Sequence, residues 1–299
     1  MTSLPFIKAH GTENDFVVLV DPDVHIELSE ERVRFLCDRR AGVGGDGVIR
    51  VATAGALQHK GVLEALPEGV EPEDWFMDYR NADGSLAEMC GNGVRVFAHV
   101  LATVGVEEKP VETNWTVGTR AGRKTVRIHS ANDFDAEVSV GMGTPVVDGV
   151  STAKVGDQQV AGLAINVGNP HLACVLPQLD ESQLQDFPLA GSVECDEAFF
   201  PQGVNLEIVT PLTSTGGTED SAGRVSMRVH ERGVGETRSC GTGTVAAAVA
   251  ALADAGIETG SVEVNVPGGK VEVTVTDDGA TLRGPSRIVA RGDVTVSPN

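Results

Sequence analysis

Short runs of β-branched residues recur along most of the chain, separated by Gly, Asp and Asn. Runs rich in Val, Ile and Thr that end at such residues are typical of β-strands. Clear examples are residues 16–20, 124–128, 137–140, 163–167, 204–209, 225–229, 262–266 and 270–276. Three helical segments interrupt them, at 29–39, 93–104 and 243–255, and Ser29 is a suitable N-cap for the first. The pattern predicts two curled sheets with few helices.

Two of these helices have almost no polar face. Residues 94–104 and 244–255 are apolar on nearly every side of a helix, yet each is shorter than the roughly 18 residues of a membrane span. Each must therefore be enclosed by protein. We expect an α/β (α+β) fold with two pseudo-symmetric domains, each a mostly antiparallel sheet or barrel curled around one apolar helix. The active site is expected in the cleft between the domains.

The two apolar helices also begin alike. Cys90-Gly-Asn-Gly opens the first and Cys240-Gly-Thr-Gly opens the second, while Asn81 and Glu231 lie at the same spacing upstream of each cysteine. The correspondence of Asn81 with Glu231 is weaker than that of the two cysteine turns. An internal duplication with one copy per domain accounts for both. A polar break at 130–135 places the domains at 1–130 with 285–299, and at 131–284.

The other cysteines and two irregular stretches show no pattern that indicates a function. Cys37 and Cys174 lie in apolar runs and are predicted to be core residues, whereas Cys195 gives no signal. Residues 54–74 are rich in Gly, Glu and Pro, and residues 214–223 are rich in Gly, Ser and Thr. We predict that both are exposed insertions without chemistry.

Composition restricts the partners. A net charge of -20 without a basic cluster repels nucleic acid and anionic lipid, so neither is expected to bind. The amino terminus has no apolar signal sequence, and we expect a soluble cytoplasmic protein. The 5 cysteines are scattered, with no Cys-x-x-Cys pair and no Cys/His zinc spacing, so neither a disulfide scaffold nor a metal site is expected.

A cysteine at the start of a buried helix is suited to proton transfer. The first N–H groups of a helix lack internal acceptors and carry partial positive charge, which stabilises a thiolate. Glycines there let the main chain approach a carboxylate closely. Two such thiols acting on one carbon, one removing a proton and the other delivering one to the opposite face, would invert a stereocentre. The pair must then hold one thiolate and one thiol.

Six segments together resemble the diaminopimelate epimerase family, in the family's order and over essentially the whole chain. They are residues 10–16, 81–85, 89–95, 168–171, 231–237 and 239–243. The resemblance implies interconversion of LL- and meso-diaminopimelate for lysine and peptidoglycan synthesis, with no pyridoxal or other cofactor. It also implies that the protein is a homodimer and that its binding partner is a small-molecule substrate.

The resemblance further implies the site residues. Cys90 and Cys240 match the family's alternating base and acid, and His171 matches a supporting histidine. The substrate-binding positions match Asn14, Asn81, Gly91, Asn92, Asn169, Asn205, Glu231, Arg232, Gly241 and Thr242. Three residues depart from the commoner pattern: Glu13 stands in place of Gly, Gly47 in place of a ligand-contacting Gln, and Thr242 in place of Ser.

Other functions share parts of this pattern. A proline racemase-like isomerase uses the same two-thiol chemistry on another amino acid. A thiol-disulfide oxidoreductase also uses two cysteines, but usually close together in sequence. A non-catalytic amino-acid-binding module would not need the thiols. The stretch from Cys90 to Arg95 approaches a phosphatase cysteine loop, but its arginine comes one residue too early.

Overall fold

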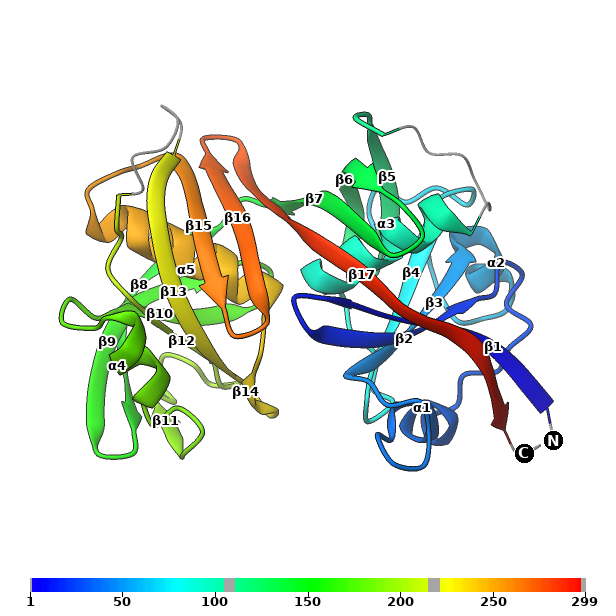
Figure 1. Cartoon of the computed structure of the whole chain (residues 1–299), viewed down its shortest axis with the longest axis horizontal. Helices are drawn as coiled ribbons and strands as arrows, with labels where there is room; N and C mark the ends of the chain where they lie inside the picture. The colour runs from blue at the N-terminus through cyan, green and yellow to red at the C-terminus, as the bar shows by residue number, and fades with distance from the viewer. Residues whose placement is uncertain (1, 105–110, 215–220, 297–299) are drawn as a thin grey trace. The chain divides into compact units, whose positions relative to one another are not determined.

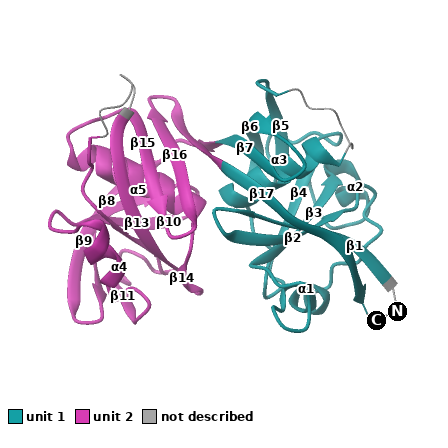
Figure 2. Cartoon of the chain, viewed as in Figure 1, with its two compact units in different colours: residues 1–140, 285–299 teal, residues 141–284 magenta. Residues whose placement is uncertain are grey.

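The computed structural model of this chain describes residues 2–104, 111–214 and 221–296. It divides into two compact units, Met1–Val140 with Pro285–Asn299, and Gly141–Gly284 (Figure 2). The sequence-based boundary after residue 130 falls inside a strand, β6 (Gly122–Ala131). The structural division lies in the following strand, β7 (Asp135–Gly143).

The first unit is a succession of paired strands around one helix (Figure 1). Its other strands are β1 (Thr2–Gly11), β2 (Asn14–Val20), β3 (Gly47–Thr53), β4 (Trp75–Asn81), β5 (Asn114–Thr119) and part of β17 (Gly279–Val296). Neighbours in chain order pair from β1 to β7, and β17 pairs with both β1 and β7, so the succession closes on itself. The pairs β2–β3 and β4–β5 are parallel, whereas the others whose register is defined are antiparallel.

Helix α3 (Gly91–Thr103) packs against β1, β2, β3, β4 and β6 of this unit. Every residue from Gly91 to Leu101 is buried, including Arg95 and His99. Two shorter helices, α1 (Glu30–Cys37) and α2 (Ala54–His59), belong to the same unit. Ser29 caps α1 by accepting a hydrogen bond from the Arg32 N–H, as its position in the sequence predicted.

The second unit repeats this arrangement around helix α5 (Gly241–Asp254). Its strands are β8 (Val146–Val155), β9 (Gln158–Asn166), β10 (Pro170–Val175), β11 (Val193–Cys195), β12 (Asn205–Val209), β13 (Ser221–Glu231), β14 (Gly235–Thr237), β15 (Gly260–Val266) and β16 (Gly269–Thr276). Parallel pairs β10–β12 and β13–β15 lie within an otherwise antiparallel succession. Helix α5 packs against β9, β10, β12, β13, β15 and β16, and a short helix, α4 (Glu181–Asp186), contacts β13.

The fold class expected from the sequence is confirmed, since each unit is a curled sheet around an apolar helix. Cys37 and Cys174 are buried as predicted, and burial raises the pKa of each thiol to about 12. Within the described part of the chain, no helix has the length and apolar character needed to span a membrane.

The prediction that 54–74 is an exposed insertion holds only in part. Ala54, Leu57, Leu63 and Val70 are buried and pack in one cluster with Phe76. The apolar side chains of this stretch are spaced irregularly between Gly and Pro, so the sequence pattern did not predict the short helix α2 or the packing of the loop that follows it. The second predicted insertion, 214–223, includes residues 215–220, which lie outside the described residues, and its end begins β13.

The enclosure of α5 around most of its circumference can be tested. Ala246, Ala247 and Ala248 point in directions about 100° apart and all have 0% exposure. We expect each change to Leu to lower the free energy of unfolding by about 1–3 kcal/mol, measured by chemical denaturation. The exposed Asp254→Ala, on the same helix, is the control. A Leu tolerated without loss at any of the three positions would show that the helix has an open face.

Candidate active site

Cys90 is the N-cap of α3, the enclosed helix of the first unit. Its backbone is extended, with φ -142 and ψ 116, and its sulfur accepts a hydrogen bond from the Gly93 N–H at 3.4 Å. The sulfur also lies 3.5 Å from Oδ1 of Asn14, which accepts a second hydrogen bond from Nδ2 of Asn92 at 3.3 Å. Three residues predicted for the site are thus in contact.

Cys240 has the same position in the second unit. Its φ is -126 and its ψ is 119, and its sulfur accepts from the Gly243 N–H at 3.4 Å. The Thr242 hydroxyl lies 3.5 Å from this sulfur. The repeated Cys-Gly-x-Gly sequence therefore folds into the same turn twice, with the thiol at the positive end of a buried helix.

The charges near the two thiols differ. Burial, followed by the nearby Glu231 and Glu207 carboxylates, raises the pKa of Cys240 well above its ordinary value. The Cys90 helix contains Arg95, which is fully buried and hydrogen bonds to two uncharged acceptors, the Pro285 carbonyl and the Thr12 hydroxyl. Burial lowers the pKa of Arg95 to about 10, although the charge of Cys90 opposes this. The helix that Cys90 caps thus contains a cation, Arg95, whereas two acids, Glu207 and Glu231, lie beside Cys240.

His171 belongs to a buried polar chain in the second unit. Its Nδ1 lies 2.7 Å from Oε1 of Glu207, and its Nε2 lies 3.0 Å from Oδ1 of Asn169. Both His171 and Glu207 have 0% exposure. Burial raises the pKa of the Glu207 carboxyl, and the contact with His171 opposes that rise. A Cβ on Gly243 would lie 2.7 Å from Glu207 Oε1 and 3.4 Å from the Cys240 sulfur, so Glu207 lies at the first turn of α5.

The remaining predicted residues of this unit lie at the ends of β12 and β13. Asn205 pairs with His171 across neighbouring parallel strands, and its Oδ1 accepts from the Arg232 backbone N–H at 2.9 Å. Glu231 accepts a hydrogen bond from the Thr237 hydroxyl at 2.5 Å. The Arg232 side chain is exposed, with one guanidinium nitrogen 3.2 Å from the Gln202 carbonyl.

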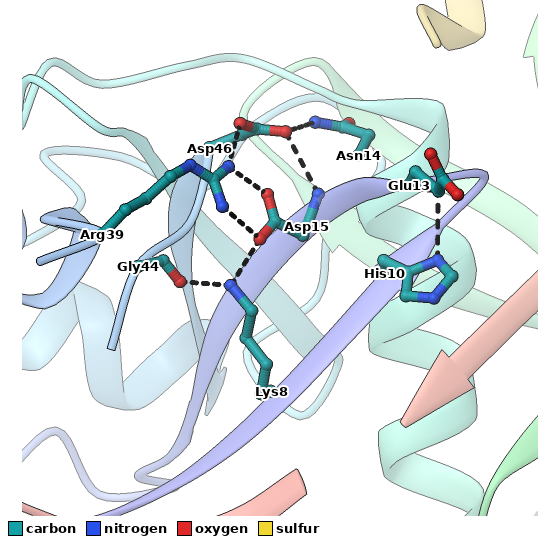
Figure 3. Close-up of polar contacts among 8 residues, drawn as sticks. All are labelled: Lys8, His10, Glu13, Asn14, Asp15, Arg39, Gly44 and Asp46. Atoms are coloured by element: carbon teal, nitrogen blue, oxygen red, sulfur yellow. Dashed lines mark hydrogen bonds and ion pairs between the residues drawn. The ribbon is translucent and has the colours of Figure 1, made fainter. Parts of the chain in front are cut away.

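In the first unit, Asn14 contacts Asp46, and Asn81 pairs with Gly47, the residue that follows Asp46. Nδ2 of Asn14 donates to the Asp46 carboxylate at 2.8 Å, and the carboxylate in turn meets Arg39, which also pairs with Asp15 (Figure 3). Asn81 ends β4, and its Nδ2 donates to the Ser85 hydroxyl at 3.0 Å.

One departure from the family pattern, Gly47, has a local explanation, whereas the backbone at Glu13 favours the commoner glycine. A Cβ at Gly47 would lie 2.5 Å from both the Arg80 carbonyl and the Tyr79 ring, so this position accepts no side chain. Glu13 has φ 61 in the turn between β1 and β2, a left-handed conformation that glycine adopts without strain.

Asp46, Arg95 and Glu207 were not assigned roles from the sequence. Glu207 follows Asn205 by two positions on a strand, so their side chains share one face, and this spacing was the available signal. Asp46 lies in the glycine-rich run 42–47, which ends at the first residue of β3. Nothing in the sequence indicates that it contacts Asn14.

The fold is shared with amino-acid racemases and epimerases. A probable proline racemase from Agrobacterium radiobacter K84 superposes with a TM-score of 0.63 at 16% identity, covering 99% of this chain and 94% of that one. A hydroxyproline epimerase from Agrobacterium vitis gives a TM-score of 0.63 at 14% identity, covering 98% of this chain and 92% of that one.

The family follows from closer similarities. The diaminopimelate epimerase family model matches residues 6–147 and 163–296. Diaminopimelate epimerase of Rhodococcus opacus is 55% identical over 291 residues, covering 97% of both chains. That of Mycobacterium tuberculosis is 56% identical over 289 residues, covering 97% of this chain and 96% of the relative. The chain belongs to the diaminopimelate epimerase family, and it is an isomerase. The resemblance found in the sequence is confirmed.

The equivalent glycines Gly93 and Gly243 provide a matched test of the two turns. A Cβ at Gly93 meets its neighbours at 3.4 Å or more, which is ordinary contact, so Gly93→Ala should raise the free energy of unfolding by about 0.5–1 kcal/mol. Gly243→Ala must displace the buried Glu207 carboxylate and should lower it by about 1–3 kcal/mol. Equal effects in chemical denaturation would mean that Glu207 does not restrict the second turn.

Asp15 gives a pH-dependent prediction. Burial raises the pKa of its carboxyl, but hydrogen bonds and charges from Arg39 and Lys8 outweigh burial and hold the pKa well below its usual range. A carboxyl with a lowered pKa in the folded state stabilises above its unfolded pKa of about 3.9, and this contribution is lost as the pH falls further. Asp15→Asn should therefore cost about 2 kcal/mol at pH 7. This difference from the unsubstituted protein should shrink below about pH 4. A difference independent of pH would contradict this account.

Proposed function

We propose that this protein epimerises diaminopimelate between its LL and meso forms without a cofactor, with Cys90 and Cys240 as alternating base and acid. The observation that supports this most is the duplicated turn, in which each sulfur accepts a hydrogen bond from the N–H three residues later at a helix N-terminus. The names of the relatives supply the substrate.

Inversion requires two proton transfers at one carbon. One cysteine, as thiolate, takes the α-hydrogen, and the other, as thiol, delivers a proton to the opposite face. The electron pair left on the carbon spreads into the adjacent carboxylate. The backbone N–H groups of Gly91, Asn92, Gly241 and Thr242, at the two helix starts, are suited to stabilise that charge because helix N-termini favour anions.

The unlike surroundings of the two thiols suit this division of roles. Acids beside Cys240 favour its thiol, whereas the buried Arg95 favours a thiolate at Cys90. Each half-reaction exchanges the two states, so neither thiol is permanently acid or base. His171, with Glu207, is suited to adjust the charge near Cys240.

The far end of the substrate carries a second ammonium and carboxylate. The exposed guanidinium of Arg232 is suited to that carboxylate, and Glu231 to the ammonium. Asn14, Asn81, Asn169 and Asn205 are proposed to complete the binding site. A homodimer in the cytoplasm, supplying lysine and peptidoglycan synthesis, is part of the same proposal and rests on the resemblance to the family.

Cysteine variants test the proposal. Cys90→Ala and Cys240→Ala should each reduce epimerisation of LL-diaminopimelate by at least about 10²-fold, because each face loses its proton carrier. Cys195→Ala removes a half-buried thiol that is outside both turns and should remain active. Product chirality is measured by chromatography.

Two results would contradict the proposal. Either is sufficient: more than a few per cent of turnover remaining in one of the two variants, or faster inversion of proline than of diaminopimelate. The second would favour the proline racemase-like alternative.

A further inference from the structure

The side-chain amide of Asn14 is held on both sides. Its Nδ2 donates to Oδ2 of Asp46 at 2.8 Å, and its Oδ1 accepts from the Cys90 sulfur at 3.5 Å and from Asn92 Nδ2 at 3.3 Å. An ionised carboxylate only accepts hydrogen bonds, so the NH₂ group must face Asp46. The carbonyl oxygen of Asn14 then has to face Cys90.

The Asp46 carboxylate is itself fixed from several directions (Figure 3). Its Oδ2 also accepts from the Asp15 N–H at 3.1 Å, and its Oδ1 accepts from Arg39 at 2.8 Å. Its backbone N–H donates to the Asp15 carbonyl at 2.8 Å, and its carbonyl accepts from the Ala82 N–H at 3.1 Å. The carboxylate has little freedom to turn away from Asn14.

The charges around Asp46 balance within the group. Arg39 contacts Asp15 at 2.6 and 2.9 Å, and Lys8 contacts Asp15 at 2.5 Å and also donates to the Gly44 carbonyl. Two acids and two bases therefore pair with one another, on β1, on β2 and in the segment between α1 and β3. From α3 itself, Arg95 adds a buried positive charge near Cys90. The effect of Asp46 on Cys90 thus passes through Asn14 more than through its own charge.

A carbonyl oxygen beside a sulfur distinguishes the two states of a thiol. It accepts a hydrogen bond from S–H, but it repels the negative charge of a thiolate. An amide turned the other way would present N–H groups and would favour the thiolate instead. The orientation of one amide therefore affects how readily Cys90 gives up its proton.

We propose that Asp46 is a positioning residue for Cys90: it fixes the Asn14 amide so that the carbonyl oxygen faces the sulfur and holds the proton there. This assignment rests on the proposed function, because only proton transfer at Cys90 gives the orientation a catalytic meaning. Asp46 lies in the glycine-rich run before β3, and its hydrogen-bonded route to the thiol runs through Asn14. In the second unit, the Thr242 hydroxyl lies 3.5 Å from the Cys240 sulfur, and a hydroxyl can turn to suit either state.

The test is the pH dependence of Cys90 alkylation by iodoacetamide in the ligand-free full-length protein, followed by peptide mass spectrometry. Asp46→Ala frees the amide to turn, so the pH midpoint of Cys90 alkylation should fall by roughly 0.5 to 1 unit. The midpoint of Cys240 in the same sample should not move. Glu30→Ala, which removes an exposed carboxylate paired with Arg34 in the same unit, is the control and should shift neither cysteine.

A double-mutant cycle identifies the route. Asn14→Ala removes the acceptor directly and should shift the Cys90 midpoint in the same direction. Adding Asp46→Ala to that variant should then give no further shift. If Asp46→Ala does not fold, as judged by circular dichroism, Asp46→Asn replaces it in the same cycle.

Each outcome decides the assignment. No shift with Asp46→Ala, or an equal further shift in the Asn14→Ala background, would overturn it. Failure of the proposed function is distinguishable, because it would show as epimerisation surviving in Cys90→Ala, whatever the alkylation midpoints are.

Discussion

A helix with apolar residues on every side has to be enclosed, and this requirement organises both units. Residues Gly91 to Leu101 of α3 are all buried, and α5 is buried in the same way over most of its length. A curled sheet is the economical way to surround such a helix. The enclosure leaves unsatisfied N–H groups at the N-terminus of each helix, and the sulfur of the capping cysteine accepts a hydrogen bond from one of them in each unit.

Duplication of this unit gives two equivalent turns in unlike surroundings. Beside Cys240 lie Glu207 and Glu231, and Glu207 is buried against His171. Beside Cys90 lie a buried arginine and a carbonyl oxygen, which act in opposite directions on the thiol. In the proposed mechanism the two thiols exchange roles in each turnover, so each must be stable in both protonation states. The opposing groups at Cys90 meet this requirement more closely than the two acids at Cys240.

Much of the fold follows from local pattern. The helices α3 and α5 and the Ser29 cap of α1 were predicted because continuous apolar runs and capping chemistry are local properties of the sequence. Helices α2 and α4 are too short to show a period. The residues behind α2 pack only after the chain returns through Phe76, so their burial depends on contacts distant in sequence.

The same distinction applies to the site. The two cysteines were found because their turns repeat along the chain. Asp46 and Glu207 contact Asn14 and His171, which lie far from them in sequence, so only the tertiary structure shows these contacts. Gly47 is a further example, because the ring of Tyr79 on the neighbouring strand is what excludes a side chain there.

The central claim, that two thiols each handle the proton on one face, is tested most directly by isotope exchange at early times in heavy water. With LL-diaminopimelate in D₂O, the account predicts that the first meso product carries deuterium at the inverted carbon, while the remaining substrate still carries hydrogen there. The removed hydrogen stays on one thiol, and the product receives solvent deuterium from the other. Early product that retains the original hydrogen would contradict the account, because it would require a single group to serve both faces.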